Sequence, residues 1–305
     1  MQIAANRSLT DQFDPRALAA LEGLDFKARY VMEGFLSGLH ESPFHGYSVE
    51  FSDYRNYQPG DDLRHLDWKL FARTDRLCIK RYELETNVQF YVVCDTSASM
   101  AYRGSRAWET KLGCARIISA AMTWFLLNQN DAAGLIALDA KSETQFIHPF
   151  SRSIQFGLML REMEKLQPAG GASLVNLLNQ TARLVRRRSV ILFFSDLLEP
   201  SAEVELYFKQ LRFHGHECLV FQVLDPDEID FPFTESHLFE DMETGARRQV
   251  SPLNAREKYL ERFSAFMEGH RKFFQSLEIP FCVIRNDENP WRALALFLSE
   301  RKRMK

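Results

Sequence analysis

The chain has 305 residues, of which 46% are hydrophobic and 26% charged, the balance of a globular protein that can bury a large core. Its net charge of −3 gives no electrostatic basis for binding nucleic acid or an anionic membrane. No stretch reaches the roughly 18 to 20 apolar residues of a membrane span, and five widely spaced cysteines argue against a disulfide framework or a zinc site. Since the N-terminus has no signal-like apolar core, we expect a cytoplasmic protein.

Residues 1–87 differ from the rest of the chain and are expected to form an α+β extension. The predicted elements are, in chain order, a helix starting at Asp14, a helix over 28–39 ended by Gly38, and strands over 44–51 and 77–82 that could pair as a small antiparallel sheet.

The segment 53–73 lies between those two strands and is dense in acids, arginines and aromatics. One interpretation is a catalytic acid/base cluster or a partner-docking face. The other is an Arg–carboxylate network that fixes the extension to the main sheet, with Trp68 as a packing anchor. We favour the structural interpretation.

Residues 88–305 alternate apolar, strand-like runs with helices that carry one apolar face. This alternation predicts an α/β fold with a doubly wound, mostly parallel sheet between two layers of helices. An insertion over about 225–252 is typical of a loop followed by a β-hairpin. Strands are predicted over 88–94, 132–138, 141–148 (an antiparallel edge), 188–194, 218–224 and 281–284, and helices over 108–129, 156–166, 174–185, 201–211, 255–277 and from 290 onward.

Oxygen-bearing side chains follow two of the predicted strands. Asp95, Ser97 and Ser99 form one tight turn after the strand 88–94, and Asp196 follows the strand that begins near 188. In a doubly wound sheet, ligands bind beyond the carboxyl ends of the strands, where the strand order reverses. We therefore expect Asp95 and Asp196 to face each other across one crevice, with an oxygen set that suits Mg²⁺.

At these residues the chain resembles a von Willebrand factor type A domain with its metal-ion-dependent adhesion site. The resemblance implies that Asp95, Ser97, Ser99, Ser173 and Asp196 surround a Mg²⁺ or Mn²⁺ ion. Ser173 stands where that family usually has Thr, a change that keeps an oxygen ligand. The alternative for Ser173 is a helix N-cap whose hydroxyl accepts a backbone N–H, because a predicted helix opens directly after it.

A second resemblance covers roughly residues 30 to 300. The motifs Pro59-Gly60-Asp61-Asp62 and Asp67-Trp68, followed by Asp95-Thr96-Ser97-Ala98-Ser99-Met100, resemble the bacterial domain-of-unknown-function family encoded beside MoxR-type AAA+ ATPases. This resemblance implies an N-terminal extension over 1–87, a von Willebrand factor A-like domain over 88–305, and a partner system that includes a MoxR-type AAA+ ATPase.

Three functions are open at this point. The leading hypothesis is a non-enzymatic, metal-dependent protein-interaction module that acts as adaptor or co-chaperone of the ATPase or its client. The second is metal-assisted hydrolysis or phosphoryl transfer at Asp95 and Asp196, with a base from the extension. The third is a structural protein with a vestigial metal site. The candidate bases for the second are Asp61, Asp62 and Asp67.

Overall fold

The computed structural model describes the residues 18, 21–40, 54–56, 78–80, 88–139, 141–152, 154–169, 173–199, 202–235 and 237–304. The chain divides into two compact units. The larger one combines Met1–Leu36 with Val88–Lys305, and the smaller one is Ser37–Asn87. Nearly all of the acid- and aromatic-rich segment 53–73 lies outside the described residues, as do Asp61, Asp62, Asp67 and Trp68.

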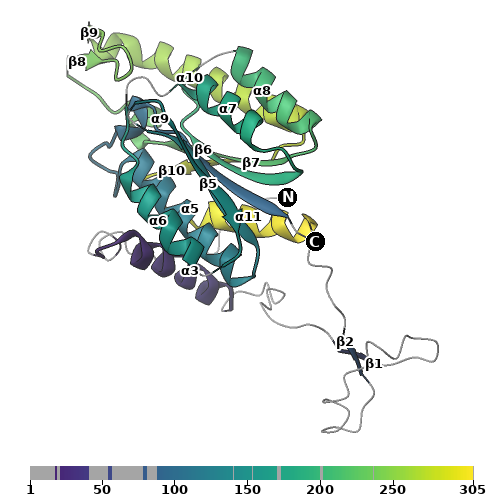
Figure 1. Ribbon diagram of the computed structural model, residues 1–305. Coiled ribbons are helices and arrows are strands. Elements are labelled where there is room, and N and C mark those ends of the chain that lie inside the picture. The colour runs from purple at the N-terminus through teal and green to yellow at the C-terminus, as the bar shows by residue number, and fades with distance from the viewer. Residues whose placement is uncertain are drawn as a thin grey trace. The chain divides into compact units, whose positions relative to one another are not determined.

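A six-stranded sheet forms the centre of the larger unit (Figure 1). All of its neighbouring strands are parallel except the pair β4 and β5, which is antiparallel and places β5 at one edge. The predicted α/β class with a doubly wound, mostly parallel sheet is confirmed. The order across the sheet is β10 (Phe281–Arg285), β7 (Glu217–Leu224), β6 (Ser189–Ser195), β3 (Gln89–Cys94), β4 (Ala132–Leu138) and β5 (Thr144–Phe150).

Helices cover both faces of this sheet, which explains why its central strands are apolar along their whole length rather than alternating. Every residue of β6 is buried, as is every residue of β3 after the first. One face carries α5 (Lys111–Asn128), α6 (Ile154–Lys165) and α11 (Trp291–Met304), and the other carries α7 (Leu174–Leu184), α8 (Ala202–Phe213) and α10 (Pro252–Ser276).

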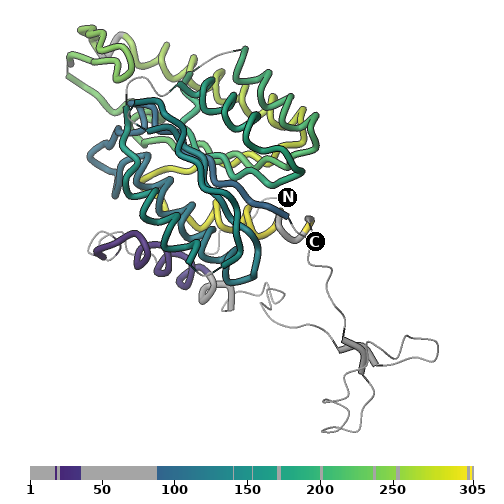
Figure 2. Tube along the Cα trace, in the orientation of Figure 1, coloured from purple at the N-terminus to yellow at the C-terminus, as the bar shows by residue number. Residues whose placement is uncertain are grey.

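Aromatic rings join the helices to the sheet on the second face. The ring of Phe208 in α8 packs edge-on against Phe193 of β6 at 5.3 Å and against Phe274 of α10 at 5.1 Å between centroids. On the first face, Figure 2 shows α11, in yellow, returning beside α5, where Phe297 meets Phe125 at 6.1 Å. These contacts fix the helical layers, and through them the loops at the ends of the strands.

The helix predicted over 28–39 is α3 (Leu24–His40), and it differs from the prediction at both ends. It begins four residues earlier because its buried stripe, Leu24, Ala28, Val31, Met32 and Phe35, starts at Leu24. It also runs through Gly38, since an interior glycine costs a helix only about 1 kcal/mol. The backbone N–H of Leu24 donates to Glu164 of α6 at 3.2 Å, and α3 as far as Leu36 belongs to the larger unit, whereas we predicted the whole helix as part of the extension.

The smaller unit contains the antiparallel pair β1 (Tyr54–Asn56) and β2 (Cys78–Lys80), with Arg55 opposite Ile79. The strand predicted over 77–82 therefore pairs with 54–56, whereas the predicted strand 44–51 lies outside the described residues. A ladder of three residues on each side is too short for alternation alone to identify its partner.

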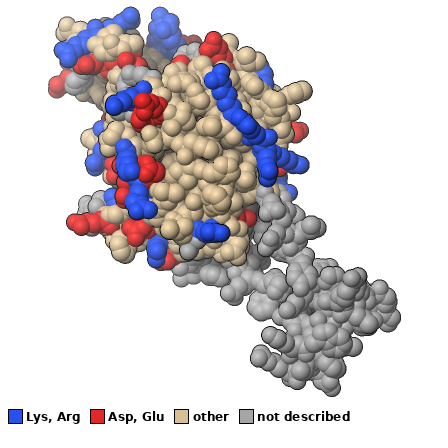
Figure 3. Space-filling model, in the orientation of Figure 1, with Lys and Arg blue, Asp and Glu red and all other residues tan. Residues whose placement is uncertain are grey.

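The segment between β7 and α10 contains the short helix α9 (Pro226–Asp230) and an antiparallel hairpin of β8 (His237–Glu240) and β9 (Arg247–Val250). Within the described residues, none of the helices is long and apolar enough to cross a membrane. Figure 3 shows one face of the molecule, on which charged side chains of both signs surround a broad uncharged area.

Candidate functional site

The reversal of strand order falls between β3 and β6. From β3 the chain passes through α5 to β4 on one side, whereas from β6 it passes through α8 to β7 on the other. The last register pair of the two strands is Cys94 with Phe194, and the N–H of Asp95 donates to the carbonyl of Phe194 at 2.9 Å. Asp95 and Asp196 therefore sit at neighbouring strand ends, at the position where doubly wound sheets bind ligands.

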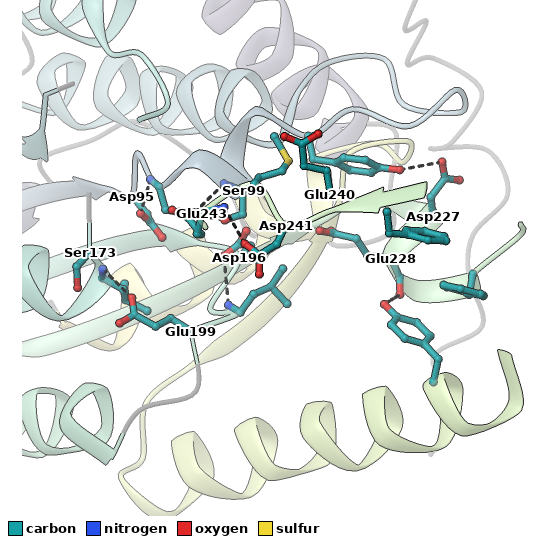
Figure 4. A pocket seen from close by; sticks show the side chains of 18 of the residues that line it. Asp95, Ser99, Ser173, Asp196, Glu199, Asp227, Glu228, Glu240, Asp241 and Glu243 are labelled. Atoms are coloured by element: carbon teal, nitrogen blue, oxygen red, sulfur yellow. Dashed lines mark hydrogen bonds between the residues drawn. The ribbon is translucent and has the colours of Figure 1, made fainter. Parts of the chain in front are cut away.

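A cavity of about 690 Å³ opens above these strand ends (Figure 4). Its lining includes all five residues that the sequence identifies: Asp95, Ser97, Ser99, Ser173 and Asp196. Within the described part of the chain, the lining supplies eight carboxylates, with those of Asp95 and Asp196 included, and no Lys or Arg. The carboxylates are those of Asp95, Asp196, Glu199, Asp227, Glu228, Glu240, Asp241 and Glu243.

The carboxylate of Asp95 is buried and fixes the turn that follows it. Its Oδ1 accepts a hydrogen bond from the N–H of Ser97 at 2.9 Å, and its Oδ2 accepts one from the hydroxyl of Ser195. The hydroxyls of Ser97 and Ser99 lie 3.2 Å apart. Burial, followed by the nearby charge of Asp196, raises the pKa of Asp95 to about 7. The turn thus presents two hydroxyl oxygens beside a carboxylate whose ionised form is destabilised.

Asp196 is held by a lysine that the sequence analysis did not identify. The Nζ of Lys111 lies 2.8 Å from Oδ2 of Asp196 and 2.6 Å from Oε1 of Glu228, and its side chain is fully buried. Burial lowers the pKa of Lys111, but the two carboxylates outweigh this effect and raise it above its usual range. Lys111 is therefore a fixed positive charge beneath the cavity.

The sequence contains a weak indication of the roles of Lys111 and Glu228. Lys111 is the first residue of α5, where the helix dipole disfavours a cation, and this unfavourable placement is a hint of a buried partner. Glu228 belongs to the pattern Asp-x-x-Glu, which is typical of a capping box at the start of a helix. The side chain of Asp225 caps α9, and Oε2 of Glu228 accepts a hydrogen bond from the N–H of Asp225 at 2.8 Å.

Ser173 occupies the N-cap position of α7, but its side chain makes no capping hydrogen bond. The carboxylate of Glu199 does this instead, accepting from the N–H of Leu174 at 3.1 Å. The capping alternative for the Ser173 hydroxyl therefore has no support in the geometry, and the side chain lines the cavity.

We expect Ser173→Ala to change the free energy of unfolding by less than about 0.5 kcal/mol, because no capping bond is lost. Thr110→Ala is the matched control, since the Thr110 side chain accepts from the N–H of Gly113 at 3.0 Å at the start of α5. It should cost about 1 kcal/mol. Urea denaturation of both variants measures the difference, and an equal loss in both would restore a capping role for Ser173.

The hairpin reaches into the cavity from the opposite side. Oε1 of Glu243 accepts a hydrogen bond from the N–H of Ser99 at 2.9 Å (Figure 4). The turn that carries Glu243 is organised by Asp241, whose Oδ1 accepts from the N–H groups of Glu243 and Thr244 at 2.9 Å each. A carboxylate from a distant part of the chain thus contacts the Asp-x-Ser-x-Ser turn.

The cavity wall beside the hairpin is aromatic. Phe231 packs against Tyr259 at 4.6 Å between centroids and lies parallel to Phe239 at 5.8 Å, while Phe233 meets Phe239 edge-on at 5.1 Å. All four line the cavity, together with Met242 of the hairpin turn. The site therefore has an oxygen-rich end at the strand tips and an apolar end under the hairpin.

The donor set at the strand tips fits a hard divalent cation. Two serine hydroxyls and the carboxylate of Asp95 converge on one side of the cavity, with Asp196 directly after the adjacent strand β6, and Mg²⁺ prefers oxygen ligands of this type. Within the ranges that the structure describes, no group of three or more His, Cys, Asp or Glu side chains is arranged to hold a metal ion. Metal binding here would thus depend on the serines.

Comparison with known proteins identifies relatives along most of the chain. Residues 53–272 match the protein family described as "Protein of unknown function DUF58". The uncharacterised proteins Mb1516 of Mycobacterium bovis and Rv1480 of Mycobacterium tuberculosis strain H37Rv are each 27% identical to this chain over 296 residues, which cover 95% of it and 91% of the relative.

Among solved structures, the chain is similar to the conserved hypothetical protein BatB from Bacteroides thetaiotaomicron, with 13% identity, a TM-score of 0.41, and coverage of 71% of this chain and 99% of that one. It is also similar to the SpRpn10 VWA domain, with 13% identity, a TM-score of 0.35, and coverage of 65% and 88%. The fold assignment itself rests on the strand order and register described above.

Proposed function

We propose that this chain, which belongs to the DUF58 family of proteins of unknown function, is a protein-interaction module that binds an acidic side chain of a partner with the help of Mg²⁺ or Mn²⁺. The observation that carries the proposal is the convergence of Asp95, Ser97, Ser99, Ser173 and Asp196 on one open cavity at the point where the strand order reverses.

The residues divide into two roles. Ser97 and Ser99 supply hydroxyl ligands, and Asp95 and Asp196 orient the surrounding water through their carboxylates. A bound divalent ion supplies the positive charge that draws a partner's carboxylate into a cavity otherwise lined by acids. Ser195 keeps Asp95 oriented, and Lys111 does the same for Asp196.

An interaction role is better supported than catalysis. Among the residues that the structure describes, those lining the cavity include no His or Cys, and the buried amine of Lys111 beside it is bound by two carboxylates. General acid–base chemistry needs a group that can exchange its proton near neutral pH while touching the substrate. Asp95 lines the cavity and has a pKa of about 7, but both of its carboxylate oxygens already accept hydrogen bonds, from the N–H of Ser97 and the hydroxyl of Ser195. The bases proposed for a hydrolase, Asp61, Asp62 and Asp67, lie outside the described residues.

The partner is proposed from the sequence motifs, since the Pro59-Gly60-Asp61-Asp62 and Asp67-Trp68 segments resemble those of chains encoded beside MoxR-type AAA+ ATPases. An adaptor or co-chaperone role with such an ATPase, or with its client, follows from this resemblance. In a pull-down with the ATPase, chelation by EDTA should release it from the wild-type chain.

Lys111 supports one alternative. The ammonium of Lys111 already neutralises Asp196. In this alternative the protein has a structural role, its metal site is vestigial, and Lys111 takes the place of the metal ion. Metal binding distinguishes the two functions directly.

We expect Mg²⁺ and Mn²⁺ to raise the unfolding temperature of the wild-type chain, by the equivalent of about 2.7 kcal/mol at a concentration 100 times the Kd. The double variant Ser97→Ala/Ser99→Ala should lose this response because it lacks both hydroxyls, whereas Ser276→Ala, in α10, should keep it. Differential scanning calorimetry measures the shift. An unchanged unfolding temperature of the wild type at every metal concentration would leave only the structural alternative.

A further inference from the structure

The hairpin turn is an unusual neighbour for an interaction site, because it places an acidic side chain where the proposed partner would place its own. Glu243 contacts the backbone N–H of Ser99 at 2.9 Å, within the turn that carries both serine hydroxyls. The contact is solvent-exposed and spans 144 residues of sequence. The hairpin lies between β7 and α10 and forms a two-stranded sheet separate from the central one.

The hairpin is anchored on one side only. Phe239 packs against Phe231 and Phe233, but the neighbouring Leu238 is 62% exposed, and the pair formed by Glu240 and Arg247 lies in solvent. Each such exposed ion pair contributes at most about 1 kcal/mol. Among the described residues, the ring contacts of Phe239 and the hydrogen bond of Glu243 hold the turn over the cavity.

Charge repulsion prevents a second carboxylate from binding at the Ser97–Ser99 turn while Glu243 is there. The described residues in the cavity wall include eight acids and no Lys or Arg, so a second carboxylate entering beside Glu243 would meet like charges at close range. Exchange of one carboxylate for another leaves the charge of the cavity unchanged. A partner's acid can therefore occupy the Ser97–Ser99 turn only when Glu243 leaves it.

The residue that precedes Glu243 in the turn is also informative about the partner. Met242, directly before Glu243, lines the same cavity as the aromatic wall. Met242 is 41% exposed, so one turn presents an accessible apolar side chain followed directly by an acid at the mouth of the site.

From these observations we propose that the Asp241–Glu243 turn is a built-in competitor, and that the partner is a peptide segment in which a large apolar residue directly precedes an acid. The proposal rests on the proposed function, because it assumes that the cavity binds a partner's carboxylate. Glu243 lowers the apparent affinity for that segment by the fraction of time it occupies the Ser99 amide.

The test uses the full chain and a synthetic peptide with the sequence of residues 239–247, Phe-Glu-Asp-Met-Glu-Thr-Gly-Ala-Arg. Glu243→Gln should bind this peptide at least about tenfold more tightly than the wild type, measured by isothermal titration calorimetry in excess Mg²⁺. Glu268→Gln is the matched control, since Glu268 is an exposed acid of α10 that pairs with Arg271 and Lys272 and is not among the residues that line the cavity. It should bind the peptide as the wild type does.

Two altered peptides test the chemistry of the segment. Replacing its second Glu, which corresponds to Glu243, by Gln should abolish binding to the Glu243→Gln chain, and replacing its Met by Ala should weaken binding. If the unaltered peptide binds all three chains with equal affinity, or binds none of them, the proposal that the Asp241–Glu243 turn competes with the partner is wrong.

The Mg²⁺ response of the same three chains separates this result from the proposed function. If Mg²⁺ stabilises all three chains and Glu243→Gln gains no affinity for the peptide, the proposed competition by the Asp241–Glu243 turn is wrong but the metal-dependent function stands. If Mg²⁺ stabilises none of them, the metal-dependent function is wrong, and tighter peptide binding by Glu243→Gln would still support the competitor.

Discussion

Replacing Lys111 by methionine is expected to lower the free energy of unfolding by about 3–5 kcal/mol. Methionine has nearly the same length and no charge, so the substitution removes the ammonium while keeping most of the packing. Asp196 and Glu228 then lose the cation that lies 2.8 Å and 2.6 Å from them. Breaking a buried ion pair costs more than the pair contributes, because the remaining carboxylates stay desolvated without a partner.

Lys209→Met is the matched control for Lys111→Met. Lys209 also pairs with a carboxylate, Glu205 at 3.5 Å, but both side chains are about half exposed, and such pairs contribute less than about 1 kcal/mol. Guanidinium denaturation of both variants measures the difference. Similar losses in the two variants would show that Lys111 is not a structural counter-ion.

A second substitution tests whether the cost comes from the stranded carboxylates. Adding Glu228→Gln to Lys111→Met removes one of them, so the double variant should be more stable than Lys111→Met alone. Residues in one network are expected to be non-additive by about 0.5–3 kcal/mol in a double-mutant cycle. Strict additivity would place Lys111 and Glu228 in separate environments.

The sheet could be predicted from sequence because its central strands carry their signal locally. The runs that became β3 and β6 are apolar along their length, and a strand buried on both faces between helices has this composition. The position of Asp95 and Asp196 followed from fold class alone, since parallel strands bring their carboxyl ends to one edge.

The partners of those aspartates could not be predicted in the same way. Lys111 meets Asp196 and Glu228 across 85 and 117 residues of sequence, and a lysine is rarely fully buried unless it is paired. Ser195 bonds to Asp95 only because the register sets Cys94 opposite Phe194. Such contacts depend on how the layers pack, so a local pattern can hint at a buried partner, as for Lys111, but does not identify it.

The contact of Glu243 with Ser99 could not be predicted from sequence either. The sequence predicts a hairpin turn at 241–245, and turn residues are usually exposed. Its contact with Ser99 depends on where α9 and the aromatic residues Phe231 and Phe239 direct the hairpin. The acidic turn is thus visible in the sequence, but its target is not.

Asp95→Asn should make the metal-free chain more stable than the wild type at pH 8, by an amount on the order of 4 kcal/mol at most, since one pKa unit is about 1.4 kcal/mol. The pKa of Asp95 rises from an ordinary 3.8 to about 7 in the folded chain, chiefly through burial and then through the charge of Asp196. The folded state therefore binds this proton more tightly than the unfolded state. Wild-type stability should fall as the pH rises from about 4 through 7.

Asparagine has the shape of the aspartate and does not ionise, so the stability of the variant should lack that fall. Its carbonyl can still accept from the N–H of Ser97, and its amide can donate to the hydroxyl of Ser195. Asp139→Asn is a control of opposite sign, because hydrogen bonds from the N–H groups of Glu143 and Lys141 lower the pKa of Asp139. That variant should lose stability relative to the wild type as the pH rises through the acid range.

The same Asp95→Asn variant should bind Mg²⁺ about 10–100-fold more weakly than the wild type, because its amide holds coordinated water less well than a carboxylate. A gain in stability at pH 8 together with a loss of Mg²⁺ response would identify Asp95 as a charge kept for binding at the expense of the fold. A variant that is less stable than the wild type at pH 8 would show instead that the hydrogen bonds of the Asp95 carboxylate outweigh its burial and its repulsion from Asp196. In that case the carboxylate would stabilise the turn with or without an ion.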